Sequence, residues 1–148
     1  MFEEAAIELN AVQDELPWSK QRRMLQTFLH QETEDWASMK DSAKSLRFEF
    51  PHEEDWWVSE AYATRRAESL VEARKILIEG LTIHYESAII RYNLACYACQ
   101  LNSPGESLDF LKEAVRRDEK YKVLALHDED LKMIRDALVQ MGWENTPI

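Results

Sequence analysis

The feature that most constrains this chain is a spacing of 34 residues between equivalent positions in its helical segments. Small or apolar residues recur at that interval, in the pairs Ala61 and Ala95, Ala73 and Ser107, Leu77 and Leu111, and Gly80 and Ala114. A helix–turn–helix unit of this length can bury its apolar face only against the next unit, and small side chains let neighbouring helices approach closely. We therefore expect an all-α chain of stacked helix pairs.

Composition supports this expectation and excludes several other classes of protein. With 148 residues the chain has the length of about one domain. It contains only three glycines and four prolines, whereas a hairpin-rich β fold or a phosphate-binding loop would need more glycine. The net charge of −10 argues against nucleic acid and against an anionic membrane as partners, because both require Lys and Arg.

Targeting signals and cysteine usage point to a cytoplasmic protein. The first residues are acidic, unlike the basic start of a signal peptide, and no apolar run approaches the roughly 18 residues needed to cross a bilayer. The two cysteines, Cys96 and Cys99, lie three apart within a helical stretch. That spacing excludes a disulfide framework and fits a reducing compartment.

Apolar periodicity predicts helices over residues 2–16, 20–31, 36–47, 53–67, 69–83, 87–101 and 103–117. The clearest start signal is Ser103 followed by Pro104 and Glu106, which is typical of a capping box. Residues 122–126 are expected to form a short connecting segment before a last helix that is capped by Asp128. That helix carries the apolar stripe Leu131, Ile134, Leu138 and Met141, and Gly142-Trp143 predicts a left-handed stop with an apolar contact.

With these residues in place, the chain resembles the tetratricopeptide repeat (TPR) family. The best unit covers 88–121, with Asn93-Leu94-Ala95, Ala98, Ser107, Leu111 and Ala114; the unit at 54–87 keeps Trp57, Ala61, Ala73, Leu77 and Gly80. Glu60 stands where the family prefers an aliphatic residue. Residues 20–53 are interpreted as a degenerate third unit. The resemblance implies an α-solenoid with an N-terminal capping helix in 1–19 and a C-terminal capping helix and tail in 122–148.

The resemblance also implies a peptide-binding groove, since in this family the first helix of each pair lines the concave face. Carried over to this chain, the groove comprises Phe28, Val58, Tyr62, Arg65, Arg66, Ile89, Tyr92, Cys96 and Gln100. The alternative is that these residues form core against the terminal helices. Met24 and Phe28 stand where some members carry the Lys and Asn that grip a C-terminal carboxylate, which argues against binding to the tails of the major heat-shock chaperones.

No group of residues indicates catalysis or metal binding. Cys96 and Cys99 have a redox-type spacing but fall in mid-helix without a preceding strand, and zinc would need two further ligands. His52-Glu53 begins like a zinc-protease helix but lacks the second histidine. We therefore expect no enzyme, no catalytic or metal-binding residue and no cofactor.

The function expected from the sequence is a non-enzymatic protein–protein interaction module, an adaptor or chaperone-like protein that holds a partner peptide or helix. Two alternatives stay open. One is a type III secretion-type chaperone, against which the Asp128-Glu129-Asp130-Leu131 ending stands. The other is a self-associating unit that forms a homodimer through its C-terminal helix. A redox enzyme acting through Cys96 and Cys99 comes last.

Overall fold

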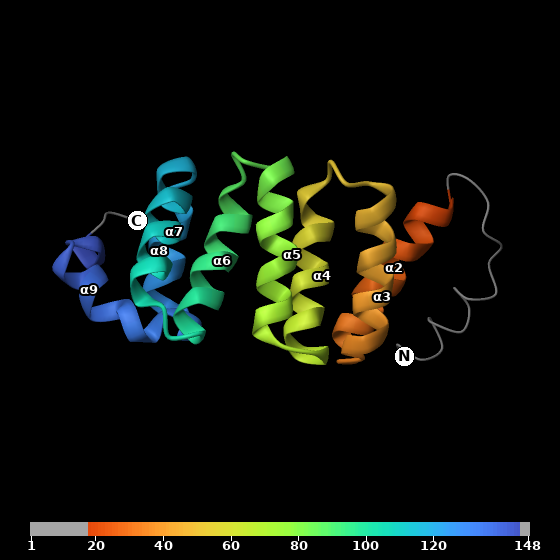
Figure 1. Cartoon of the computed structure of the whole chain (residues 1–148), viewed down its shortest axis with the longest axis horizontal. Coiled ribbons are helices and arrows are strands. Elements are labelled where there is room, and N and C mark those ends of the chain that lie inside the picture. The colour runs from red at the N-terminus through yellow and green to blue at the C-terminus, as the bar shows by residue number, and fades with distance from the viewer. Residues whose placement is uncertain (1–17, 146–148) are drawn as a thin grey trace. The chain divides into compact units, whose positions relative to one another are not determined.

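The computed structural model describes residues 18–145, and every regular element in that range is a helix (Figure 1). The elements are α2 (Trp18–Glu32), α3 (Trp36–Glu49), α4 (Glu54–Ala67), α5 (Leu70–Ile83), α6 (Ala88–Gln100), α7 (Pro104–Arg117), α8 (Lys120–His127), the 3-10 helix η1 (Glu129–Ile134), α9 (Arg135–Gln140) and the 3-10 helix η2 (Trp143–Asn145). The expected all-α class is confirmed. The predicted helix over 2–16 lies outside the described residues.

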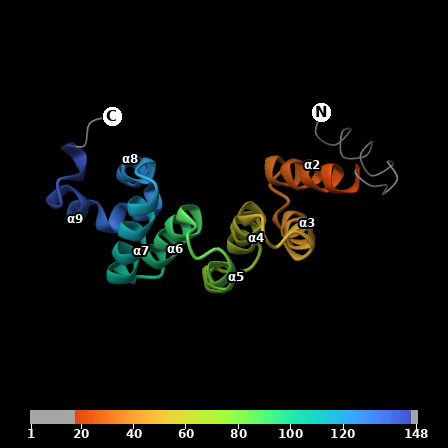
Figure 2. The same ribbon diagram turned by 90° about the horizontal axis from the view of Figure 1, so that it is seen from above.

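The chain divides into two compact units, with the boundary between Ile76 and Leu77 inside α5. In unit 1, α2 packs against α3 and α3 against α4 (Figure 2). The core of this unit comes mainly from α3 and α4, with Leu29 of α2, and includes Met39, Ala43, Leu46, Trp57 and Ala61. The small side chains of Ala43 and Ala61 allow close helix packing.

Local hydrogen bonds fix where the helices of unit 1 begin. The Asp35 side chain accepts a hydrogen bond from the Ser38 amide and so caps α3. The buried Trp57 indole donates to the Pro51 carbonyl at 2.8 Å. Pro51 lies in the turn between α3 and α4, because a proline cannot continue α3. The bond from the buried Trp57 therefore ties this turn to the core.

In unit 2, α6 packs against α7 and η1, and it is buried on most of its sides. Its buried residues include Ile90, Leu94 and the run Ala95–Cys99. The Ser107 hydroxyl of α7 donates to the Ala95 carbonyl of α6 at 2.7 Å. Because this contact brings the two helices close together, a small residue is required at both Ala95 and Ser107.

The C-terminal part differs from the sequence prediction. Residues 120–127 form helix α8 rather than a connecting segment, because Tyr121 and Ala125, one turn apart, both face the core. The expected last helix is divided into η1 and α9. The buried residues explain the division: Leu131 and Ile134 are three apart, as a 3-10 turn requires, whereas Ile134 and Leu138 are four apart.

Two of the three predicted helix-end signals are confirmed. The Asp128 side chain caps η1 by accepting from the Asp130 amide at 3.0 Å. Gly142 has φ +84°, a left-handed conformation that favours glycine, and Trp143 beyond it is buried. At the third, Ser103 is the N-cap of α7 and Pro104 its first residue, as predicted, but the Ser103 side chain makes no capping hydrogen bond.

Candidate functional site

In unit 1 two predicted groove residues, Tyr62 and Arg66, meet Trp36. The Tyr62 and Trp36 rings contact edge to face, with centroids 5.7 Å apart and planes at 66°. The Arg66 guanidinium carbon lies 3.7 Å from the Tyr62 centroid and 5.0 Å from the Trp36 centroid. Arg66 Nη1 also donates to the Tyr62 carbonyl at 3.0 Å. We call Trp36, Tyr62 and Arg66 the unit-1 cluster.

The sequence explains how these side chains come together. Tyr62 and Arg66 are four apart on α4, so they share one face of that helix. Trp36 is the first residue of α3, which packs against α4. Lys40 of α3 forms an ion pair with Glu68, the residue that follows α4, and so joins the two helices. The hydrogen bond between these two side chains raises the pKa of Lys40.

The cluster is accessible to a partner molecule. Trp36 and Tyr62 are half-buried, and Arg66 is exposed. A cation over an aromatic ring is attracted by about 0.5–1 kcal/mol at exposed sites. These contacts, with the bond to the Tyr62 carbonyl, restrict the Arg66 guanidinium.

The other predicted residues of unit 1 are also at least partly accessible. Val58 and Arg65 are half-buried, and Phe28 is exposed. Trp36 is the member that sequence reasoning missed. Trp36 is three residues before the buried Met39, and periodicity alone does not distinguish a ring at the edge of a core from one inside it.

A buried ion pair supports α4 from within unit 1. Glu60 is only 2% exposed, and both of its carboxylate oxygens accept from Arg47 of α3, at 2.7 and 3.0 Å. The Arg47 guanidinium also lies 4.8 Å from a Trp57 ring centroid. This partner explains how an acidic residue is accommodated at a position where an aliphatic one was expected.

In unit 2 the groove prediction is wrong for Tyr92 and Cys96. Their exposed fractions are 8% and 3%, and the C-terminal segment contacts both of them. The Tyr92 hydroxyl donates to Asp128 Oδ2 at 2.7 Å, and Cys96 Sγ lies 3.7 Å from the same oxygen. The Tyr92 ring also stacks on Tyr121, with centroids 4.7 Å apart.

The burial of Tyr92 changes the pKa of its hydroxyl group. Burial, followed by the hydrogen bond to Asp128, raises the pKa of Tyr92 far above its usual value. Ile89 is half-buried and Gln100 is exposed, with the Gln100 amide donating to the Asp130 carbonyl at 3.0 Å. Tyr92, Cys96 and Gln100 contact the C-terminal segment and so do not line an open groove.

The same region contains a set of groups that could ligate a metal ion: Cys96, Asp128 and Asp130 each place one ligand atom within 4.8 Å of the others. A cavity of about 410 Å³ lies beside it, lined by Tyr92, Leu124, His127, Asp128 and Glu129. Both Asp128 oxygens already have structural partners, Oδ1 in the Asp130 amide and Oδ2 in Tyr92. Asp128 thus caps η1 through Oδ1 and joins the C-terminal segment to α6 through Oδ2.

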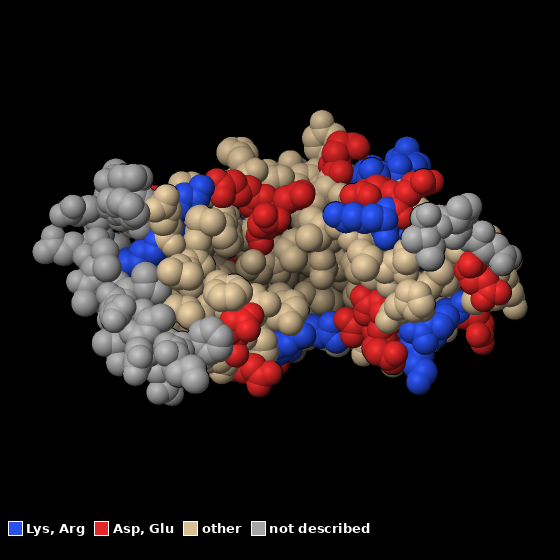
Figure 3. Space-filling model, turned by 180° about the vertical axis from the view of Figure 1, so that it is seen from behind, with Lys and Arg blue, Asp and Glu red and all other residues tan. Residues whose placement is uncertain are grey.

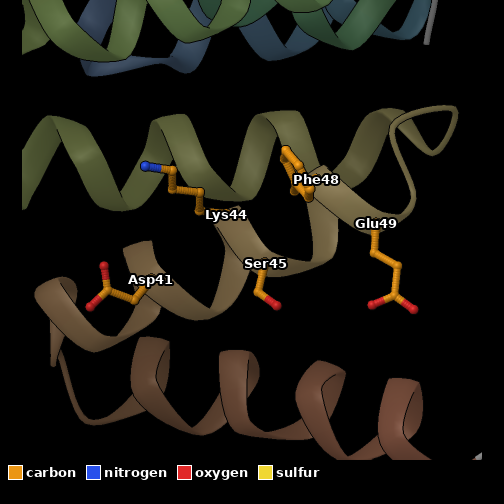
Figure 4. Close-up of a pocket in the computed structure, with 5 residues that line it drawn as sticks. All are labelled: Asp41, Lys44, Ser45, Phe48 and Glu49. Carbon is orange, nitrogen blue, oxygen red and sulfur yellow. The ribbon is translucent and has the colours of Figure 1, made fainter.

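A second cavity, of about 560 Å³, opens on α3 in unit 1 and is lined by Asp41, Lys44, Ser45, Phe48 and Glu49 (Figure 4). Figure 4 shows Asp41, Ser45 and Glu49 along one side of the helix. Arg23 of α2 already contacts two of these, donating to Ser45 Oγ at 3.0 Å and pairing with Glu49 at 2.7 Å. The cavity is open, and its charges are mixed in sign.

On the face drawn in Figure 3, acidic and basic side chains lie interspersed. Ion pairs also join charged residues of one helix, such as Glu113 with Arg116 and Arg117 of α7. Among the helices that the structure describes, none has the length and apolar character of a membrane span.

Comparison with known proteins adds no functional information. No protein family matches the chain, and no curated protein matches it. The function is therefore argued from the geometry of the unit-1 cluster.

Proposed function

We propose that this chain is a non-enzymatic protein–protein interaction module, built as a TPR-like array, that binds its partner through the unit-1 cluster. The observation that carries the proposal is the position of Arg66, exposed and stacked over two half-buried aromatic rings. Trp, Tyr and Arg are the residue types that contribute most often to the binding energy of protein interfaces.

The geometry of the cluster suits recognition of a peptide. Association costs free energy when long side chains must be ordered, and the ring contacts and the bond to the Tyr62 carbonyl restrict Arg66 beforehand. The exposed ring surface offers apolar contact, while a guanidinium can bind a carboxylate. The preferred ligand is a partner segment with an apolar side chain next to an acidic one.

The proposed site is smaller than the groove expected from the sequence. Tyr92 and Cys96 are buried by the C-terminal segment and are left out of it. Tyr62 and Arg66 remain, Trp36 is added, and Val58 and Arg65 are half-buried residues of the same helix as Tyr62.

The test compares two charge reversals in unit 1. Arg66→Glu removes the stacked cation, whereas Lys75→Glu makes the same change at an exposed position of α5. Each variant is immobilised beside the wild type in lysate of the source organism, and captured proteins are quantified by mass spectrometry after circular dichroism has shown that both variants are folded.

The proposal predicts a protein that the wild type and Lys75→Glu capture equally and that Arg66→Glu loses by at least about tenfold, equivalent to roughly 1.4 kcal/mol. If Arg66→Glu captures the same proteins in the same amounts, the unit-1 cluster is not the binding site.

A further inference from the structure

An apolar stripe on α2 is not covered by the described part of unit 1. Met24, Leu25 and Phe28 are 40, 46 and 51% exposed, although each is a large apolar residue. They are neighbours on the helix surface, because Met24 and Phe28 are one turn apart. By contrast Thr27 and Leu29 of the same helix are buried. We call Met24, Leu25 and Phe28 the α2 stripe.

The beginning of α2 is basic. Lys20, Arg22 and Arg23 lie in its first two turns, and the first turn contains no acidic residue. Positive charge at a helix N-terminus is unfavourable unless acidic groups lie nearby. Lys20 pairs with Glu53 and Arg23 with Glu49, so unit 1 already supplies acidic partners on one side of α2.

Residues 1–17, which lie outside the described residues, have the complementary character. They contain five acidic residues and no Lys or Arg: Glu3, Glu4, Glu8, Asp14 and Glu15. Their apolar residues Phe2, Ala5, Ala6, Leu9, Val12 and Leu16 recur at helical spacing. This acidic amphipathic sequence is joined directly to the start of the basic helix that carries the stripe.

We propose that residues 2–16 are an intramolecular ligand of unit 1 and pack as an amphipathic helix, antiparallel to α2, on the α2 stripe. In such a helical hairpin the turn is formed by the residues around Pro17, because antiparallel helices are joined by about 2–5 residues. Both helices rise by about 1.5 Å per residue, so Leu9 then lies near Leu25, and Asp14 near Lys20. The same register of the two helices brings apolar side chains next to apolar ones and acidic side chains next to basic ones.

The occupant is this segment of the same chain and not a second copy, because of its direct covalent connection. A segment tethered by a short link has an effective concentration in the millimolar range at its site. A second copy at micromolar concentration competes poorly against it. This inference concerns other residues than the unit-1 cluster and does not depend on the proposed function.

Hydrogen–deuterium exchange of the full-length protein tests the proposal, with peptides that cover residues 2–16 as the readout. Leu25→Glu removes an apolar contact from the stripe, and Leu9→Asp removes its partner in the segment. Leu25 is 46% exposed, and Leu9 lies outside the described residues. Met133→Glu, at an exposed apolar position of unit 2, is the matched control.

In the wild type and in Met133→Glu, the amides of residues 2–16 should exchange at least about tenfold more slowly than those of an unstructured peptide. In Leu25→Glu and in Leu9→Asp that protection should be lost, while protection around Met39 and Leu46 is kept. Exchange at the unstructured rate in the wild type would overturn the proposal, as would protection that survives both substitutions. Protection that increases with protein concentration, together with a doubled mass by light scattering, would also overturn it by assigning the contact to a second copy.

Discussion

The buried pair between Arg47 and Glu60 gives the sharpest test of how unit 1 is held together. Arg47→Met removes both hydrogen bonds to a carboxylate that is only 2% exposed, and Met can still contact the Trp57 ring. A buried charge without its partner costs about 3–5 kcal/mol. That loss is a large part of the roughly 5–15 kcal/mol by which a domain is stable.

The double variant Arg47→Met with Glu60→Leu should behave differently from the single one. It replaces the pair with apolar side chains, and such replacements are neutral or stabilising by about 1–4 kcal/mol. Glu60→Leu alone should cost less than Arg47→Met, because the Arg47 side chain is 16% exposed and can reach water whereas that of Glu60 is 3% exposed. Urea unfolding, followed by circular dichroism and tryptophan fluorescence, gives the free energies of unfolding. The reasoning is refuted if the double variant is as unstable as Arg47→Met.

Tyr92→Phe removes the hydrogen bond to Asp128 and should destabilise unit 2 by about 1–2 kcal/mol; an unchanged melting temperature would contradict this. Ser103→Ala should change the free energy of unfolding by less than about 0.5 kcal/mol, because the Ser103 side chain makes no capping hydrogen bond. Ser87→Ala should cost about 1 kcal/mol, because Ser87 Oγ accepts from the Ile90 amide. Equal losses of stability would show that the capping assignment is wrong. Hydrogen bonds from Ser38 lower the pKa of Asp35 below 3.8, so its stabilising contribution is present above that pH and is lost as the pH falls through the lower, folded-state pKa. Thermal unfolding measured from pH 5 downwards should thus depend less on pH in Asp35→Asn than in the wild type, and identical curves would speak against the cap.

Most of the described helices could be predicted from the sequence because apolar spacing, prolines and capping residues are local signals. The predicted range 36–47 corresponds to α3, and the start at Pro104 is that of α7. Helix α8 was missed since its inward residues, Tyr121 and Ala125, are only two within eight residues. So short a stretch does not establish a helical period.

The candidate site was predictable only in part. Tyr62 and Arg66 followed from the register of α4, because both lie on one helix. The burial of Tyr92 depends on Asp128, which is 36 residues away, and a contact between distant segments leaves no periodic pattern. The partner of Glu60 was hidden for the same reason, as Arg47 lies on another helix.

Site-specific photo-crosslinking tests the central claim most directly. A benzophenone amino acid in place of Tyr62 keeps an aromatic ring in the unit-1 cluster, and the same group in place of the exposed Val71 is the control. Both variants are expressed in the source organism, irradiated and analysed by mass spectrometry. The account predicts a discrete crosslinked protein from position 62 and none from position 71. The account is contradicted if position 62 gives no crosslink, or if both positions give the same products.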